Sequence, residues 1–355
     1  MNTIKTRSLN GLLLILFTCP VLWAQQDFPE QKAILCFDIR VDKIRESQFT
    51  KSLTEREFGD ETLADVAVTA LTKNWRFLPT SPKKFKRVFG MAGVPESLEE
   101  IRRRYGQGLE NPFPGEFVME LEFIDKTAAD SMLEGVDKGD PSEINGVSYY
   151  QRFSENGLEH LLVGKKSPTR VTFGTKSFIS AAKPQSLFTA ELSKLWSQQS
   201  KAPIRFSIEG ETRSDLLAEF LDSLLENMPR GMRPVIHTFS NLRTLNLMID
   251  PDADKMISVR TTATDEESGA EVRETINGLL GLSKLSGKQW AAEVQGETPI
   301  FASLIQTVCN DLQAAGKGRE ANIAIKKPKE LVAALNELMD ISAAKAKERL
   351  GIPSK

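Results

Sequence analysis

The residue types that usually carry catalysis or bind metals are scarce in this chain and widely spaced. There are two histidines, His160 and His237, which lie 77 positions apart, and three cysteines. Neither a Gly-x-Ser-x-Gly nucleophile elbow nor a His-Glu-x-x-His zinc motif occurs. A zinc site on either histidine would need carboxylates or thiols for its other ligands. We therefore expect both histidines to be structural or surface residues, and we assign no catalytic, cofactor-binding or metal-binding residue.

Two short motifs resemble ligand-binding loops but lack the required spacing. Asp250, Asp252 and Asp254 alternate as at the start of a calcium loop, but its sixth and twelfth positions would be a lysine and a threonine. The segment 316–319 (GKGR) carries glycines and positive charge without the spacing of a phosphate-binding loop, and it precedes a predicted strand. We interpret the first motif as a polar hairpin turn and the second as a connector, and we expect no cofactor.

Charged residues gather in two basic clusters and one acidic pair. The basic clusters are Lys83 to Arg87 and Arg102 to Arg104. They could meet an anionic polymer or a membrane surface, but adjacent glutamates and the acidic chain favour solvated helix faces. Glu120 and Glu122 alternate with apolar residues, so an exposed sheet face explains them more simply than a catalytic pair of carboxylates.

The overall composition is that of a folded soluble protein. Of the 355 residues, 40% are hydrophobic and 26% are charged. These values exclude collagen-like, disordered and multi-span membrane proteins. The 46 basic and 48 acidic residues give a net charge of -2, so no overall basic field indicates a nucleic-acid partner.

The first 24 residues have the organisation of a secretory signal peptide. Lys5 and Arg7 precede the apolar stretch 11–17 (GLLLILF), and cleavage is expected after Ala24. This predicts a protein that is periplasmic or secreted, with no membrane-spanning segment left after removal of residues 1–24.

Two alternatives to simple cleavage stay open, and so does the state of two cysteines. The segment could remain as an uncleaved anchor, although Pro20 interrupts it, or Cys19 could be lipidated. In an oxidising compartment Cys36 and Cys309 could form a disulfide. The alternative is that they are two separate buried thiols.

The hydrophobic pattern predicts an α+β fold. Residues 42–110 are expected to be mainly helical, with Leu63, Val66, Ala67, Ala70 and Leu71 on one face and a second helix at 97–105. Period-two alternation is clearest at 116–124. The further strands are expected at 33–41, 147–153, 159–164, 170–175, 203–209, 242–250, 255–264 and 321–325. The further helices are expected at 125–136, 177–182, 213–228, 266–280, 299–315 and 331–350.

The order of these elements suggests an internal repeat. The strand 116–124 with its following helix resembles the strand 255–264 with its helix, and the strand 33–41 resembles 203–209 in the same way. We predict two weakly related halves, 25–190 and 191–355, divided near 183–201. Each would be a mainly antiparallel sheet with helices packed on one face.

Several segments also resemble a group of exported proteins of unknown function that is frequent in planctomycete-type bacteria. The residues that carry the resemblance are 161–164 (LLVG) with 170–175 (RVTFGT), 245–249 with 257–259, and 324–328 before the last helix. The resemblance implies export and an α+β fold, and it supplies no activity or site residue.

These observations favour an exported, non-enzymatic protein that acts as a binding or structural component of the bacterial envelope. Its partner would be an envelope protein or a small ligand. One alternative is a small-molecule or lipid-binding protein with a cleft between its halves, where such sites are common. Another is a hydrolase that uses carboxylates alone, which keeps the question of enzymatic activity open.

Overall fold

A computed structural model gives the fold of most of the chain. It describes residues 33–53, 84–93, 116–133, 136, 140–153, 160–181, 187–198, 201–210, 238 and 241–349. Several predictions lie outside these residues: the signal peptide, the helices expected near 63–71, 97–105 and 213–228, the cluster Arg102 to Arg104, and His237.

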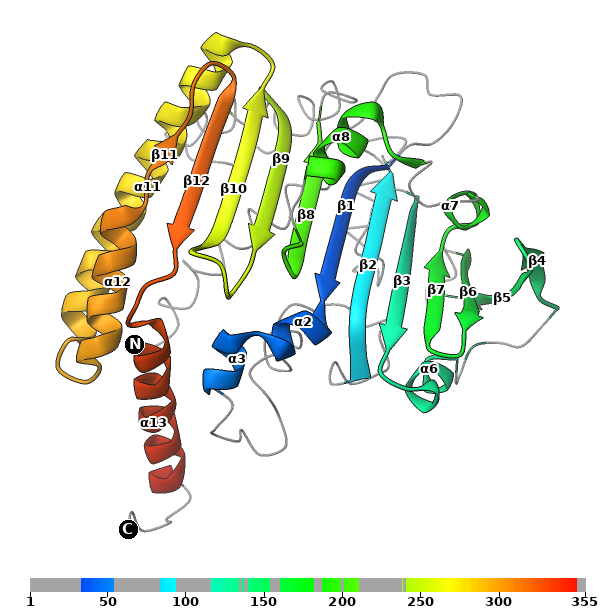
Figure 1. The fold of residues 1–355 in the computed structure, drawn as a ribbon, viewed down its shortest axis with the longest axis horizontal. Coiled ribbons are helices and arrows are strands. Elements are labelled where there is room, and N and C mark those ends of the chain that lie inside the picture. Colours follow the sequence, from blue (N-terminus) through cyan, green and yellow to red (C-terminus); the bar gives the residue numbers. More distant parts are fainter. Residues whose placement is uncertain are drawn as a thin grey trace.

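A single antiparallel sheet of twelve strands organises the described residues (Figure 1). Its spatial order is β11-β12-β10-β9-β8-β1-β2-β3-β7-β6-β5-β4, and every one of these neighbouring pairs is antiparallel. The predicted α+β class is confirmed. The strands are β1 (Ala33–Arg40), β2 (Phe85–Gly93), β3 (Phe117–Phe123), β4 (Ser142–Ile144), β5 (Val147–Phe153), β6 (His160–Ser167), β7 (Arg170–Gly174), β8 (Ile204–Glu209), β9 (Leu242–Ile249), β10 (Lys255–Ala263), β11 (Ala314–Ala315) and β12 (Glu320–Lys326).

Two series of four strands have the same order in this sheet. β1-β2-β3-β7 and β8-β9-β10-β12 run outward from the centre, where β1 pairs with β8. In each series the third strand leads into a helix whose N-cap is an aspartate. Asp125 accepts the N–H of Ala128 at 2.7 Å, and Asp265 accepts that of Ser268 at 2.8 Å. The two halves share one continuous sheet through the pairing of β1 with β8. That the two halves are related to each other as an internal repeat stays a prediction.

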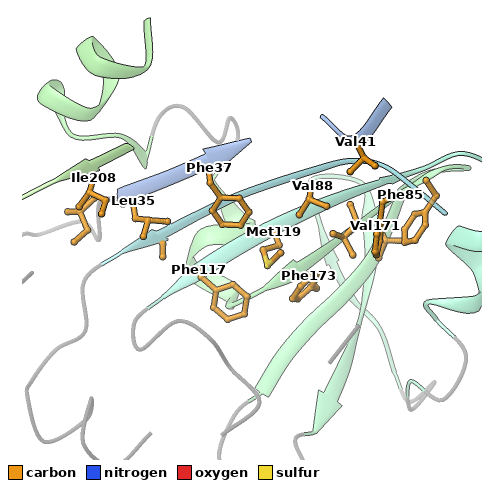
Figure 2. Close-up of a cluster of buried hydrophobic side chains, with 14 of the residues drawn as sticks. Leu35, Phe37, Val41, Phe85, Val88, Phe117, Met119, Val171, Phe173 and Ile208 are labelled. Atoms are coloured by element: carbon orange, nitrogen blue, oxygen red, sulfur yellow. The ribbon is translucent and has the colours of Figure 1, made fainter. Parts of the chain in front are cut away.

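Both faces of the sheet carry a hydrophobic cluster. Face 1, with Leu35, Phe37, Met119 and Phe173, holds the larger cluster (Figure 2). It is covered by α6 (Lys126–Ser131) and α11 (Glu266–Val294).

Face 2 is the opposite side of the sheet. Its cluster includes Cys36 and Met91 and packs against α7 (Lys176–Ser180) and α8 (Ala190–Gln198) through Phe178 and Leu192. Helices thus cover parts of both faces, where we expected one, because the central strands are apolar on both sides.

The strand β2 was not expected from the sequence. It lies between β1 and β3, with Phe85, Val88 and Met91 buried, although this segment was assigned to a helical region with a solvated basic cluster. That prediction is wrong because carboxylates on neighbouring strands neutralise the basic residues. Arg87 binds Asp38, and Lys86 lies 3.2 Å from Glu122.

The remaining helices are α2 (Val41–Glu46), α3 (Gln48–Leu53), α12 (Pro299–Asp311) and α13 (Leu331–Arg349). The helix predicted at 266–280 continues to Val294 and packs against α12 (Figure 1). The contact is close at Gly287, where an added Cβ would lie 2.3 Å from the Cys309 sulfur. No helix in the described ranges is both long enough and apolar enough to cross a membrane.

The two cysteines in the described residues are free and buried in different clusters. Cys36 lies on β1 and Cys309 on α12. Of the two alternatives left open by the sequence, separate buried thiols are confirmed and the disulfide is not formed.

Candidate functional site

Two polar regions lie on face 2 of the sheet. The first, which we call the ionic cluster, consists of Asp38, Arg40, Arg87 and Arg205, on the adjacent strands β1, β2 and β8. The second is a pocket over β9, β10 and β12. Strand alternation places both regions on the same side of the sheet. Arg205 is the cross-strand partner of Asp38, and Ser207, two residues further along β8, has its side chain on the same face. Ser207 donates a hydrogen bond to Asn246, which lines the pocket.

Three arginines surround a single buried carboxylate in the ionic cluster. Arg87 donates from Nε to Asp38 Oδ1 at 2.6 Å and from Nη2 to Oδ2 at 3.1 Å. Oδ2 also accepts Arg205 Nη2 at 2.5 Å and Arg40 Nε at 3.3 Å. The Asp38 side chain is 0% exposed, so the cluster replaces all of its hydration with charged hydrogen bonds.

Aromatic rings cover part of the ionic cluster. Trp196 of α8 lies 4.2 Å from the Arg205 guanidinium carbon, and Phe89 lies 5.5 Å from that of Arg87. Trp196 also contacts Phe89 and Phe188 edge to face, with ring centroids 6.1 and 6.2 Å apart. Such stacking stabilises a guanidinium that is removed from water. The helix α8, which carries Trp196, lies within residues 183–201, where we expected the two halves to divide.

The electrostatic setting keeps Asp38 ionised and Cys36 protonated. Burial raises the pKa of the Asp38 carboxyl, but the hydrogen bonds and charges of Arg87 and Arg205 outweigh burial and hold this pKa below its usual value. Burial, together with the charge of Asp38, raises the pKa of the Cys36 thiol well above its usual value. A buried, protonated thiol is a poor nucleophile, so Cys36 is a packing residue.

The acidic pair Glu120 and Glu122 forms a ladder of ion pairs beside the cluster. Glu120 lies 3.0 Å from Lys166, and Glu122 lies 3.3 Å from Arg170 and 3.2 Å from Lys86. Each carboxylate is thus held by cations rather than by the other carboxylate. This arrangement favours the sheet-face interpretation over an acid–base pair.

The pocket over the second half of the sheet has a volume of about 560 Å³. Its polar lining is dominated by uncharged hydroxyl and amide side chains: Thr244, Asn246, Ser258, Thr262, Gln313 and Asn322. Two of these hydroxyls, on Thr244 and Thr262, lie 2.6 Å apart. All residues that line it fall between 195 and 324, so it lies within the second half rather than between the halves.

Charged side chains at the pocket are free to meet a ligand. Lys255, Arg260 and Glu320 line it and are exposed. Within the described part of the chain, none of the three side chains is in an ion pair. The pocket can therefore offer a hydrogen-bonding lining together with charges of both signs.

The two loop motifs singled out in the sequence lie in connections between strands, as predicted. Asp250 and Asp252 lie in the turn between β9 and β10, where Asp250 accepts the backbone N–H of Asp252. The Asp252 carboxylate accepts the N–H groups of Gln48 and Phe49, at the start of α3. The segment 316–319 connects β11 and β12, and His160 begins β6.

Sequence reasoning missed the ionic cluster. Asp38 follows five buried apolar residues in β1, with Arg40 two positions further on, and a buried carboxylate requires cationic partners. That signal was available, but the partners Arg87 and Arg205 are 49 and 167 positions away. In the described ranges, no group of three or more His, Cys, Asp or Glu residues is arranged to hold a metal ion.

No family model matches this chain, and no curated protein matches it. Among solved structures, crystal forms I, III and IV of TP0453 are similar, with TM-scores of 0.34, 0.35 and 0.35 and sequence identities of 12, 11 and 12%. The alignments cover 87, 86 and 86% of this chain and 95, 95 and 93% of the other. TM-scores this low carry no conclusion about fold or function.

Proposed function

We propose that this chain is an exported, non-enzymatic binding protein of the bacterial envelope that holds a small hydrophilic ligand in the pocket over β9, β10 and β12. Export is supported by the charged, apolar and small-residue order of residues 1–24. The resemblance to exported planctomycete-type proteins agrees with it. The mature protein would be periplasmic or secreted.

The observation that carries the proposal is the chemistry of the pocket lining. Hydroxyl and amide groups on three adjacent strands converge on a space of about 560 Å³, which suits a small molecule. Apolar side chains also line the pocket, Leu195 and Ile323 being the largest, so a ligand must meet polar and apolar groups together. A lipid acyl chain would desolvate the polar groups without satisfying them, so a hydrophilic ligand fits better.

The charges at the rim narrow the ligand class further. Arg260 and Lys255 can meet a carboxylate, and Glu320 can meet an ammonium group. A short peptide carries both charges and also the amide groups that the threonines and asparagines would bind. We infer that the ligand is a zwitterionic, amide-rich molecule of the size of a di- or tripeptide.

Calorimetric titration tests this directly. The full chain is expressed with its own N-terminal segment, purified from the envelope fraction, and titrated with a mixture of dipeptides and tripeptides and separately with neutral disaccharides. We expect saturable binding of the peptides. Sequencing of the purified N-terminus tests export, with Gln25 as the expected first residue.

A pair of variants separates the pocket from other sites. Arg260→Gln removes a charged group that lines the pocket and should weaken peptide binding about tenfold. The control Lys288→Gln changes an exposed cation on α11, away from the pocket lining, and should bind as the unaltered chain does. Absence of peptide and disaccharide binding, or equal binding by Arg260→Gln, would refute the proposed pocket.

A further inference from the structure

The ionic cluster has more positive than negative charge. Three guanidinium groups, on Arg40, Arg87 and Arg205, share the single carboxylate of Asp38. We propose that Arg40 and Arg87, held in place by Asp38, form a binding site for an oxyanion group such as phosphate or sulfate at the centre of the sheet. This site lies on β1 and β2, so it is separate from the proposed pocket on β9, β10 and β12.

The hydrogen bonds to Asp38 use only some of the N–H donors of Arg40 and Arg87. A guanidinium carries five N–H groups. Arg40 uses only its Nε toward Asp38, and Arg87 uses Nε and Nη2. The Nη groups of Arg40 and the Nη1 group of Arg87 have no hydrogen-bond partner in the described residues. Because Arg40 and Arg87 are cross-strand partners, these donors lie side by side.

Burial divides the cluster into a fixed base and an accessible rim. The side chains of Asp38 and Arg205 are 0% and 10% exposed, whereas those of Arg40 and Arg87 are 31% and 34% exposed. An anion arriving from solvent would therefore meet Arg40 and Arg87 first. The buried carboxylate has already ordered both guanidiniums, which lowers the entropic cost of binding.

The charged residues around the ionic cluster do not cancel its excess of positive charge. Along this part of face 2, six cationic side chains share three carboxylates in the ion pairs. The acids nearest Arg87 after Asp38 are Glu120 and Glu122, and both are engaged by Lys86, Lys166 and Arg170. This part of face 2 therefore attracts anions.

The chemistry of guanidinium groups selects the ligand class. Their planar fork matches the oxygen spacing of phosphate and sulfate, so two adjacent forks can bind one such group through several charged hydrogen bonds. The group could be a free oxyanion or part of a phospholipid headgroup. Both sources present the same tetrahedral, negatively charged oxygens.

Calorimetry with inorganic phosphate and sulfate at low ionic strength tests the site on the full chain. We expect saturable binding that Arg40→Gln weakens about tenfold or more, since charged hydrogen bonds are lost. Arg87 and Arg205 still satisfy Asp38 in this variant, so its unfolding midpoint should stay close to that of the unaltered chain. Lys43→Gln is the control, because Lys43 is exposed on α2 and is paired with Glu46 rather than with the ionic cluster.

Vesicle sedimentation distinguishes the two sources of the group. Vesicles with an anionic phosphodiester lipid are compared with purely zwitterionic vesicles, again with both variants. Vesicle binding that depends on Arg40 assigns the site to a headgroup, and phosphate binding alone assigns it to a soluble oxyanion. Both results support the site.

Two outcomes would overturn the proposal: no saturable binding of phosphate, sulfate or anionic vesicles, or binding that Arg40→Gln leaves unchanged. If Arg40→Gln fails to fold, Arg87→Lys provides the test. This variant keeps the charge beside Asp38 but loses the fork, so phosphate affinity should fall while the protein stays folded.

Discussion

Face 2 of the sheet has a different chemistry in each of its two halves. Around β1, β2 and β3 it carries ion pairs beside its apolar cluster, with Asp38, Glu120 and Glu122 engaged by arginines and lysines. Around β9, β10 and β12, whose order matches that of β2, β3 and β7, it is lined by hydroxyl and amide groups and is hollowed by a pocket.

The difference shows what the fold constrains and what it leaves free. In both halves face 1 is apolar and packs under the helix that follows the third strand, so its residues must stay hydrophobic. Face 2 carries less of this packing and can hold either buried charges or an open polar surface. The ionic half depends on charge compensation. The half around the pocket does not, because its charged lining residues Lys255, Arg260 and Glu320 are exposed; we call it the neutral half because most of its polar lining is uncharged.

Removal of the Asp38 carboxylate should give the largest difference in stability between the two halves. In Asp38→Asn, three guanidiniums lose the buried carboxylate that they share, and we expect the free energy of unfolding to fall by about 3 kcal/mol. Glu320→Gln is the matched control in the neutral half, where the carboxylate is exposed, and its effect should be below about 0.5 kcal/mol. Urea unfolding measures both. Similar values for the two variants would contradict the contrast.

Removal of the aromatic cover should have the next largest effect. Trp196→Ala loses the stacking on Arg205 and the contacts with Phe89 and Phe188, and we expect a loss of about 2 kcal/mol, since Trp196 is partly exposed. In Trp196→Phe, which restores most of the packing, about half of this loss should remain. A Trp196→Ala variant as stable as the original chain would show that the aromatic contacts of Trp196 do not stabilise the ionic cluster.

The pH dependence of stability should separate the two halves without any change of fold. The pKa of Asp38 is lowered in the folded state, so its contribution is complete above the unfolded pKa of about 4 and is lost as the pH falls through the lower folded value. Unfolding free energy should therefore decrease below about pH 4, by at most about 1.4 kcal/mol per pH unit from this group. In Asp38→Asn the decrease should be shallower, because only other carboxyls such as Asp265 still contribute. If the unfolding free energy of the original chain and that of Asp38→Asn decreased equally steeply with falling pH, the assignment of this pH dependence to Asp38 would be refuted.

A change in the neutral half should have the smallest effect. Thr244→Val removes the hydroxyl pair with Thr262 at 2.6 Å but leaves no buried charge, so the loss should be about 1 kcal/mol or less. Thermal unfolding monitored by circular dichroism measures it. A loss as large as that of Asp38→Asn would mean that the pocket, too, depends on a closed polar network.

Alternation along single strands was enough to predict most of the sheet. Ala33–Arg40, Phe117–Phe123 and Lys255–Ala263 were each placed within one or two residues. A continuous apolar run predicted the first, and alternation of apolar and polar positions was clearest in the second. Phe85–Gly93 was missed, since Lys86 and Arg87 interrupt the apolar pattern and their neutralising partners lie on other strands. The helix predicted at 266–280 continues to Val294, where it packs against α12 and Gly287 allows close contact with Cys309.

The sequence by itself determined the α+β class and most of the apolar faces, because these depend on periodicity and composition within short segments; the leader stays a prediction. Only the tertiary structure decided that both halves form one sheet through the pairing of β1 with β8. It alone also placed Asp38 among Arg40, Arg87 and Arg205 and opened the pocket over the second half. The physical reason is that alternation fixes which face a side chain occupies, whereas the strand order fixes which distant residues become its neighbours.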